Sequence, residues 1–190
     1  MAVDAPGRVA SVRGMYPYIR FVSTTLTERR KPPLGLFDTH HLPLICWPVD
    51  IDGFLEMNNG RILTLYDLGR FGLAIRTGLW GALQRNKWGL VVAGSSTRYR
   101  ARVTPFQRVD LRTRALGWDD KFIYIEQGMW RGETCCNHGL LRMAMTEKGR
   151  LIAPARVADA MGASDVSPPL PGWVENWADA DMTRPWPPQV

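Results

Sequence analysis

The segment WPVDIDGFLEMNNGR carries the densest group of residues in the chain that could do chemistry. Three carboxylates, Asp50, Asp52 and Glu56, precede Asn58 and Asn59. Either asparagine fits the N-cap of a helix, since its amide oxygen accepts from an unpaired backbone N–H. The first N–H groups of a helix carry a partial positive charge, so they can polarise a carbonyl group or hold an anion. A carboxylate beside such a site is a candidate base or nucleophile for acyl chemistry.

Hydrophobic spacing predicts the elements that position this segment. The apolar stretch 41–49 is short enough for a buried strand, and the residues after the two asparagines repeat at helical spacing, which predicts a central helix over 59–77. Gly69 and Gly72 lower the intrinsic helicity of that segment and let another element approach it closely. An earlier helix is expected over 16–30, and ERRKPP ends it because proline cannot continue a helix.

Beyond Lys87 the spacing of apolar residues changes from helical to two. Four stretches then predict antiparallel strands joined by short turns: 91–100, 108–115, 122–130 and 135–146. A run of hairpin-linked strands after one long helix predicts an α+β protein whose antiparallel sheet packs on that helix. Residues 155–161 are expected to form a short closing helix.

Composition divides the chain into three parts. Residues 1–36 are a leader, mobile over 1–14, and the short helix; residues 37–162 are the folded domain; residues 163–190 are an acidic tail rich in proline and tryptophan. The tail has four acids and one base, a charge of −3. Because the net charge of the chain is +6, the rest of the chain carries +9. The composition of the tail predicts disorder or extended docking. The three tryptophans favour docking onto the body or onto a neighbouring subunit.

Charge, cysteine content and the absence of long apolar runs restrict the class of protein. The start has no apolar signal region and no run is long enough to span a bilayer, which predicts a soluble cytoplasmic protein. The odd set Cys46, Cys135 and Cys136 predicts reduced thiols, and adjacent cysteines near His138 lack the spacing of a zinc site. A basic body attracts polyanions, either nucleic acid or a phosphorylated cofactor such as coenzyme A, but no nucleic-acid recognition motif is present.

One strand, a central helix and then four antiparallel strands is the order of the hotdog fold, in which the sheet wraps around the helix. VDIDGFLEMNNGRILTLYDLGR resembles the D-x-D-x-x-G-H-M-N-N-x-x-Y signature of acyl-CoA thioesterases of the 4-hydroxybenzoyl-CoA thioesterase-like class. STRYRARVTPFQRVDLRTRALGWDDKFIYIEQ resembles the second and third strands of that class, and the resemblance covers residues 41–153. The chain departs from the signature where its glycine is Leu55, its histidine is Glu56 and its tyrosine is Ile62.

The resemblance implies hydrolysis of an acyl-CoA thioester to a free acid and coenzyme A. Asp52, at the second aspartate of the signature, would act as base or nucleophile. The backbone N–H groups of Met57, Asn58 and Asn59 would form the oxyanion hole, and Asn58 would also shape the site. Glu56 either replaces the histidine of the signature as a polar or basic group or marks lost catalysis.

Arginines supply the candidate binding site for coenzyme A. Arg98, Arg100 and Arg102 recur at period two, which predicts one strand face, and Arg108 lies just past the next turn. Guanidinium groups suit phosphate geometry, although the solvent face of a strand is commonly charged anyway. Coenzyme A is part of the substrate, so neither a metal nor a redox cofactor is expected. Hotdog domains pair edge to edge, so we expect a homodimer or a dimer of dimers.

Other functions stay open at this point. A non-catalytic module that binds an acyl or aromatic ligand would keep the fold with Leu55 and Glu56 in the motif. A hotdog dehydratase acting on 3-hydroxyacyl thioesters relies on a site histidine in its relatives, which Glu56 replaces here. A partner-binding role of the tail is a further option. Asp50 and Asp52 could also serve only to shape a turn, and Glu56 only to favour the helix dipole.

Overall fold

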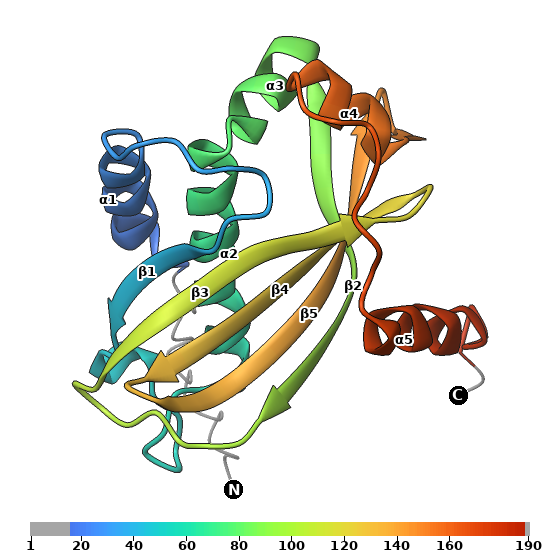
Figure 1. The fold of residues 1–190 in the computed structure, drawn as a ribbon. Helices are drawn as coiled ribbons and strands as arrows, with labels where there is room; N and C mark the ends of the chain where they lie inside the picture. The colour runs from blue at the N-terminus through green and yellow to red at the C-terminus, as the bar shows by residue number, and fades with distance from the viewer. Residues whose placement is uncertain (1–15, 189–190) are drawn as a thin grey trace, which may run out of the picture.

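The computed structural model describes residues 16–188, so the leader expected over 1–14 lies outside the described part of the chain. One curved antiparallel sheet has the strand order β1-β3-β4-β5-β2, with β6 paired to β5, and α2 lies along its inner side (Figure 1). The strands are β1 (His40–Ile45), β2 (Trp88–Tyr99), β3 (Arg108–Trp118), β4 (Phe122–Arg131), β5 (Thr134–Glu147) and β6 (Arg150–Ile152). The helices are α1 (Tyr18–Glu28), α2 (Asn59–Arg76), α3 (Leu79–Asn86), α4 (Pro154–Ala160) and α5 (Gly172–Met182), with a 3-10 turn at Pro48–Asp50. The predicted α+β hotdog architecture is confirmed.

The central helix α2 begins and runs as its sequence predicts. The side chain of Asn58 caps it, accepting hydrogen bonds from the N–H groups of Gly60 at 2.9 Å and Arg61 at 3.2 Å. A cap of this kind is worth about 1 kcal/mol. One apolar face is buried against the sheet and includes Ile62, Leu65, Tyr66, Leu68 and Leu73.

Two glycines let side chains of the sheet pack directly against the backbone of α2. A Cβ atom on Gly69 would lie 2.5 Å from Oγ1 of Thr113 on β3, and one on Gly72 would lie 2.4 Å from Cε1 of His40 on β1. Real Cβ atoms do not approach other atoms this closely. The close approach expected for these two glycines is therefore confirmed.

Helix α1 is fastened to α2 and β1 by a buried carboxylate. Glu28, whose side chain has no exposed surface, lies 3.0 Å from Nε2 of His40 and 3.3 Å from Nη1 of Arg76. Its other oxygen accepts from Nζ of Lys31 at 2.7 Å. Burial raises the pKa of Glu28, but the bonds from Lys31 and His40 outweigh it and hold that pKa below its ordinary value. Burial lowers the pKa of His40.

Several predicted boundaries are wrong for local reasons. β1 stops at Ile45, before the predicted end at residue 49, because Pro48 cannot donate to the ladder and starts the 3-10 turn. As an edge strand β1 is also only partly buried. The spacing did not predict α3 or β6. α3 begins directly after Gly78, whose φ of 82° is a left-handed conformation that reverses the chain after α2.

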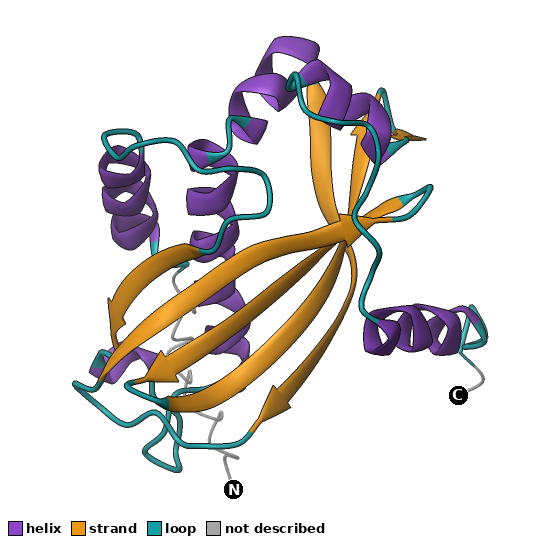
Figure 2. Cartoon of the chain, in the orientation of Figure 1, coloured by secondary structure: helices purple, strands orange, loops and turns teal. Residues whose placement is uncertain are grey.

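The tail docks on its own body, and it does so as a helix rather than in the disordered or extended form expected. α5 packs on the outer face of the sheet, since its partners Tyr124 and Leu140 point away from the side that holds α2. Val174 is fully buried there. An ion pair of 2.5 Å joins Asp181 to Arg142 on β5. Figure 2 shows this helix apart from the others, reached by a long loop after α4.

Among the helices described over residues 16–188, none is long and apolar enough to cross a membrane.

Candidate functional site

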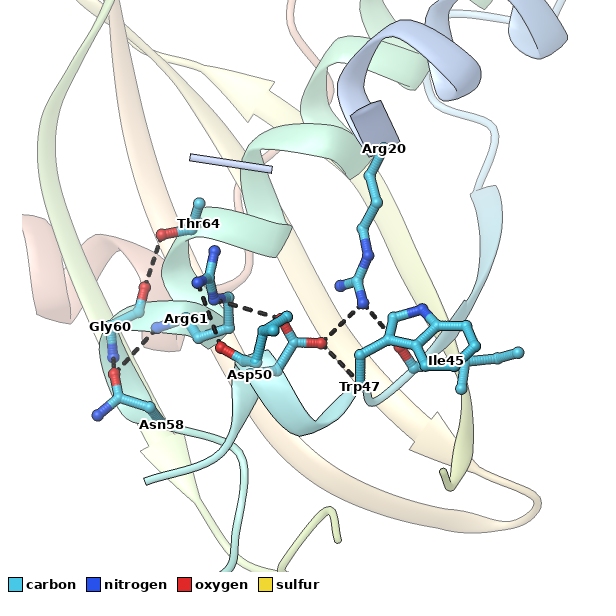
Figure 3. A network of polar contacts seen from close by, with 9 residues as sticks. Arg20, Ile45, Trp47, Asp50, Asn58, Gly60, Arg61 and Thr64 are labelled. Atoms are coloured by element: carbon cyan, nitrogen blue, oxygen red, sulfur yellow. Dashed lines mark hydrogen bonds and ion pairs between the residues drawn. The ribbon is translucent and has the colours of Figure 1, made fainter. Parts of the chain in front are cut away.

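Asp50, in the turn before α2, is a buried structural carboxylate. Its side chain is 1% exposed, and Oδ2 accepts from Nη2 of Arg20 at 2.8 Å and from the Trp47 N–H at 2.9 Å. Oδ1 lies 3.3 Å from Nε of Arg61 on α2 (Figure 3). The backbone carbonyl of Asp50 accepts from the Asn58 N–H at 2.8 Å. This carboxylate therefore holds α1, the turn and the start of α2 together. For Asp50, the structure agrees with the alternative in which the aspartates of this segment only shape the turn.

Asp52, the predicted base or nucleophile, shapes the loop. Its Oδ1 accepts from the Phe54 N–H at 2.8 Å, an Asx-type turn, and its own N–H donates to the carbonyl of Glu56 at 2.9 Å. The loop closes with Leu55 at a φ of 59°, a left-handed position where the family signature has glycine. Asp52 is partly exposed and does not line the pocket at the start of α2.

Hydrogen bonding narrows the predicted oxyanion hole to one backbone group. The Met57 N–H donates to the carbonyl of Val103 at 2.8 Å, and the Asn58 N–H is already paired with Asp50. The next two N–H groups of α2 donate to the side chain of Asn58. Among the first N–H groups of the helix, that of Asn59 is the one without a partner within residues 16–188. It sits at the positive end of the helix dipole.

A pocket of about 200 Å³ lies at this end of α2. It is bounded by the start of the helix on one side and by the end of β2 and the loop after it on the other: Glu56, Met57, Asn59, Ile62 and residues 99–103. Oε2 of Glu56 lies 3.0 Å from Nε of Arg102, and the Glu56 side chain is 31% exposed. Two lining residues therefore bring chemistry to this pocket, Glu56 with its carboxylate and Asn59 with its unpaired N–H.

The three arginines predicted on one strand face, Arg98, Arg100 and Arg102, do not share one. β2 ends at Tyr99, so Arg100 and Arg102 lie in the loop that follows and line the pocket. Arg98 on β2 and Arg108 on β3 are exposed and lie outside the pocket lining. The period-two prediction was wrong because the N–H of Arg100 donates to the carbonyl of Cys136, and the chain then bends toward α2 instead of continuing the ladder.

The cysteines and His138 have local partners. Sγ of Cys135 lies 3.4 Å from the carbonyl of Asn137, and Nε2 of His138 lies 2.9 Å from Oε1 of Glu126. Burial raises the pKa of the Cys46 thiol to about 11, so it is a poor nucleophile. Over residues 16–188, no group of three or more histidine, cysteine or acidic side chains is arranged to hold a metal ion.

Comparison with known proteins gives one family and one fold. Residues 46–177 match the model of the thioesterase-like superfamily. A Xenopus laevis protein named THEM6 is 33% identical over 128 residues, which cover 67% of this chain and 62% of that protein. The chain therefore spans about three fifths of that relative's length.

Two solved structures show the same fold at low sequence identity. A probable thioesterase from Bartonella henselae has a TM-score of 0.56 at 17% identity, covering 61% of this chain and 98% of its own. The hypothetical protein SAV2348 from Staphylococcus aureus, solved in complex with CoA, has a TM-score of 0.54 at 13% identity, covering 68% and 85%.

Proposed function

Because this chain belongs to the thioesterase-like superfamily, we propose that it hydrolyses an acyl-CoA thioester to a free carboxylic acid and coenzyme A at the pocket where α2 begins. The observation that carries the proposal is that Glu56, which has a carboxylate, and Asn59, whose N–H has no partner among the described residues, line the same pocket. Acyl transfer needs both a base for water and a donor for the oxyanion.

In the proposed reaction Glu56 takes a proton from a water molecule as the water oxygen bonds to the thioester carbonyl carbon. The N–H of Asn59 and the helix dipole hold the negative oxygen of the tetrahedral intermediate. The intermediate collapses with cleavage of the carbon–sulfur bond, and Glu56 returns the proton to the departing thiolate. Nε of Arg102, 3.0 Å from Oε2 of Glu56, holds that carboxylate in place.

Arg100 and Arg102 support coenzyme A as the leaving group. Both are exposed guanidinium groups at the rim of the pocket, where a phosphate of the substrate can reach them. A structural neighbour of this chain was solved in complex with CoA. Arg98 and Arg108 lie outside the pocket, and in this proposal they contribute only to the positive field around it.

The exposed edge of the sheet supports a homodimer. β2 is an edge strand of 12 residues, and its side chains Val91 and Val92 are 49% and 48% exposed. A long apolar edge pairs readily with another strand, so we infer that β2 pairs with its copy in a second subunit. Tyr99, at the end of β2, lines the pocket, so the partner strand would lie beside it. Light scattering coupled to gel filtration tests this, and the mass of one chain would contradict it.

Release of free thiol and free acid in equal amounts from a panel of acyl-CoAs tests the activity. We expect turnover by the wild type and a loss of about 100-fold or more in the Glu56→Gln variant. Binding of acyl-CoA without any turnover would instead support the non-catalytic module. The presence of Glu56 in place of the signature histidine, together with Leu55 in place of glycine, is the feature that keeps this second candidate in view.

A further inference from the structure

A second pocket lies at the other end of α2. Its volume is about 400 Å³, within the range of about 300–1,000 Å³ found for small-molecule sites. Aromatic and aliphatic side chains from α2, α3, β2 and β5 form most of its wall, among them Phe71, Trp80, Leu83, Trp88, Leu90 and Met143. This pocket is separate from the one at Asn59, since the two share no lining residue.

A second, smaller space lies beside this pocket, between α2 and the sheet. This apolar cavity of about 50 Å³ lies beneath the last turns of α2 and is lined by Leu73, Ile123 and Ile125 among others. Ala74, Leu90 and Met143 line both spaces, so the two lie side by side, with the smaller one on the side of the core. The pocket and this smaller space are called the distal chamber below.

Two charged groups line the distal chamber, and both lie on α2. Asp67 and Arg70, one turn apart on α2, form an ion pair, and the Asp67 side chain is 42% exposed. Nη1 of Arg70 donates to Oε1 of Gln127 at 2.6 Å, which anchors the guanidinium and leaves the aliphatic stem along the wall. Apart from this ion pair the lining of the chamber is mainly apolar, which favours an apolar ligand.

One face of α2 leads from the thioester pocket to the distal chamber. Asn59, Leu63, Asp67, Arg70 and Ala74 fall within about 80° of one another around the helix axis at 3.6 residues per turn. At a rise of 1.5 Å per residue, Asp67 lies about 12 Å from Asn59 along the axis, and Ala74 about 22 Å. Leu63, between the two sites, is 38% exposed, so this face carries an apolar step on the way.

We propose that the distal chamber receives the far end of a long acyl chain whose thioester carbonyl is held at Asn59. This rests on the proposed function, because it takes the carbonyl position from it. With carbon–carbon bonds of about 1.5 Å, an extended chain passes Asp67 after roughly ten carbons and fills the chamber at roughly twelve to eighteen. Short and single-ring aromatic acyl groups end before the chamber begins. The protein is therefore selective for long acyl groups.

Binding of free fatty acids tests the chamber without requiring turnover. Tetradecanoate, hexanoate and benzoate would be titrated by calorimetry below micellar concentrations, using the full chain. We expect tetradecanoate to bind at least about 100-fold more tightly than hexanoate or benzoate, because only its distal methylenes reach apolar walls. Equal affinities for the three acids would overturn the proposal. A lack of tetradecanoate binding, as expected if a second subunit fills the chamber, would overturn it too.

Two substitutions make the test local. Ala74→Phe fills the chamber from α2, and Phe71→Trp narrows it one turn earlier on the same helix, where the side chain is only partly buried and lies outside the β2 edge. Either should remove most of the preference for tetradecanoate while leaving hexanoate affinity unchanged. A preference that survives both variants would place the chain elsewhere. Tetradecanoate binding without hydrolysis of tetradecanoyl-CoA would keep the chamber and contradict only the proposed function; hydrolysis without chain-length preference would do the reverse.

Discussion

Nη2 of Arg20 lies 2.8 Å from Oδ2 of Asp50, and this ion pair joins α1 to the turn that precedes the central helix. The carboxylate is 1% exposed and the arginine side chain 19% exposed. A charge buried to this extent is tolerated because Arg20, Arg61 and the Trp47 N–H all face it. The site at the start of α2 thus depends on a helix that lies outside the 41–153 resemblance.

Asp50→Asn should destabilise the protein by about 2–3 kcal/mol, because it leaves Arg20 and Arg61 without their shared counter-charge. The measurement is urea unfolding followed by tryptophan fluorescence. Asp52→Asn is the matched control two residues away, where the amide oxygen can still accept from the Phe54 N–H. It should cost less than about 1 kcal/mol. An equal loss of unfolding free energy in the two variants would contradict the structural role assigned to the buried Asp50.

Local signals in the sequence were sufficient for the central helix and most of the sheet. Residue type and spacing were enough to predict three features of α2: the Asn58 cap, the apolar face and the close approach at the two glycines. The tail helix was missed because prolines dominate its flanks. Yet Val174, Trp177 and Ala178 recur at helical spacing within GWVENWADADM, and that signal could have predicted it.

The roles of the acidic residues could not be derived from spacing. Asp50 and Asp52 are equivalent on a turn until a partner is known, and Arg20 is 30 residues away along the chain. The loop bend that carries Arg100 and Arg102 to Glu56 depends on where β5 stops accepting hydrogen bonds, which no local pattern encodes. Non-local contacts decide the site, while local ones decide the fold.

Gly72→Ala should lower the free energy of unfolding by about 1–3 kcal/mol, because the new methyl group would overlap the fully buried ring of His40. Thermal unfolding followed by circular dichroism measures it. Gly81→Ala on α3 is the control. Its added Cβ meets only the end of the Arg85 side chain at 3.1 Å, so helix propensity should raise stability by up to about 1 kcal/mol. Destabilisation by both alanines would argue against a specific clash at His40.

Stability should fall as the pH drops from about 7.5 to about 5, because burial lowers the pKa of His40 below its ordinary value of 6.5. The unfolded chain then takes up a proton before the folded chain does, which favours unfolding. The pKa of Glu28 is also held below its ordinary value, so a further loss is expected below pH 4.5. Urea midpoints across this range measure both effects.

The histidine part of that dependence can be isolated by substitution. His40→Gln should flatten the loss of stability between pH 7.5 and pH 5. It should also lower stability at every pH, because Glu28 loses its contact with His40. The protein should still fold, because Lys31 and Arg76 still face Glu28. The same slope in His40→Gln and the wild type would contradict the assignment to His40.

The measurement that most directly tests the proposed reaction is kcat/KM for a long-chain acyl-CoA in Glu56→Gln and Asp52→Asn, side by side. The proposal places the base on the pocket wall, so Glu56→Gln should lose about 100- to 10,000-fold while Asp52→Asn stays within a few fold of the wild type. Both variants should retain the free energy of unfolding of the wild type to within about 1 kcal/mol. A large loss in Asp52→Asn with Glu56→Gln still active would contradict the proposal and restore Asp52 as the base.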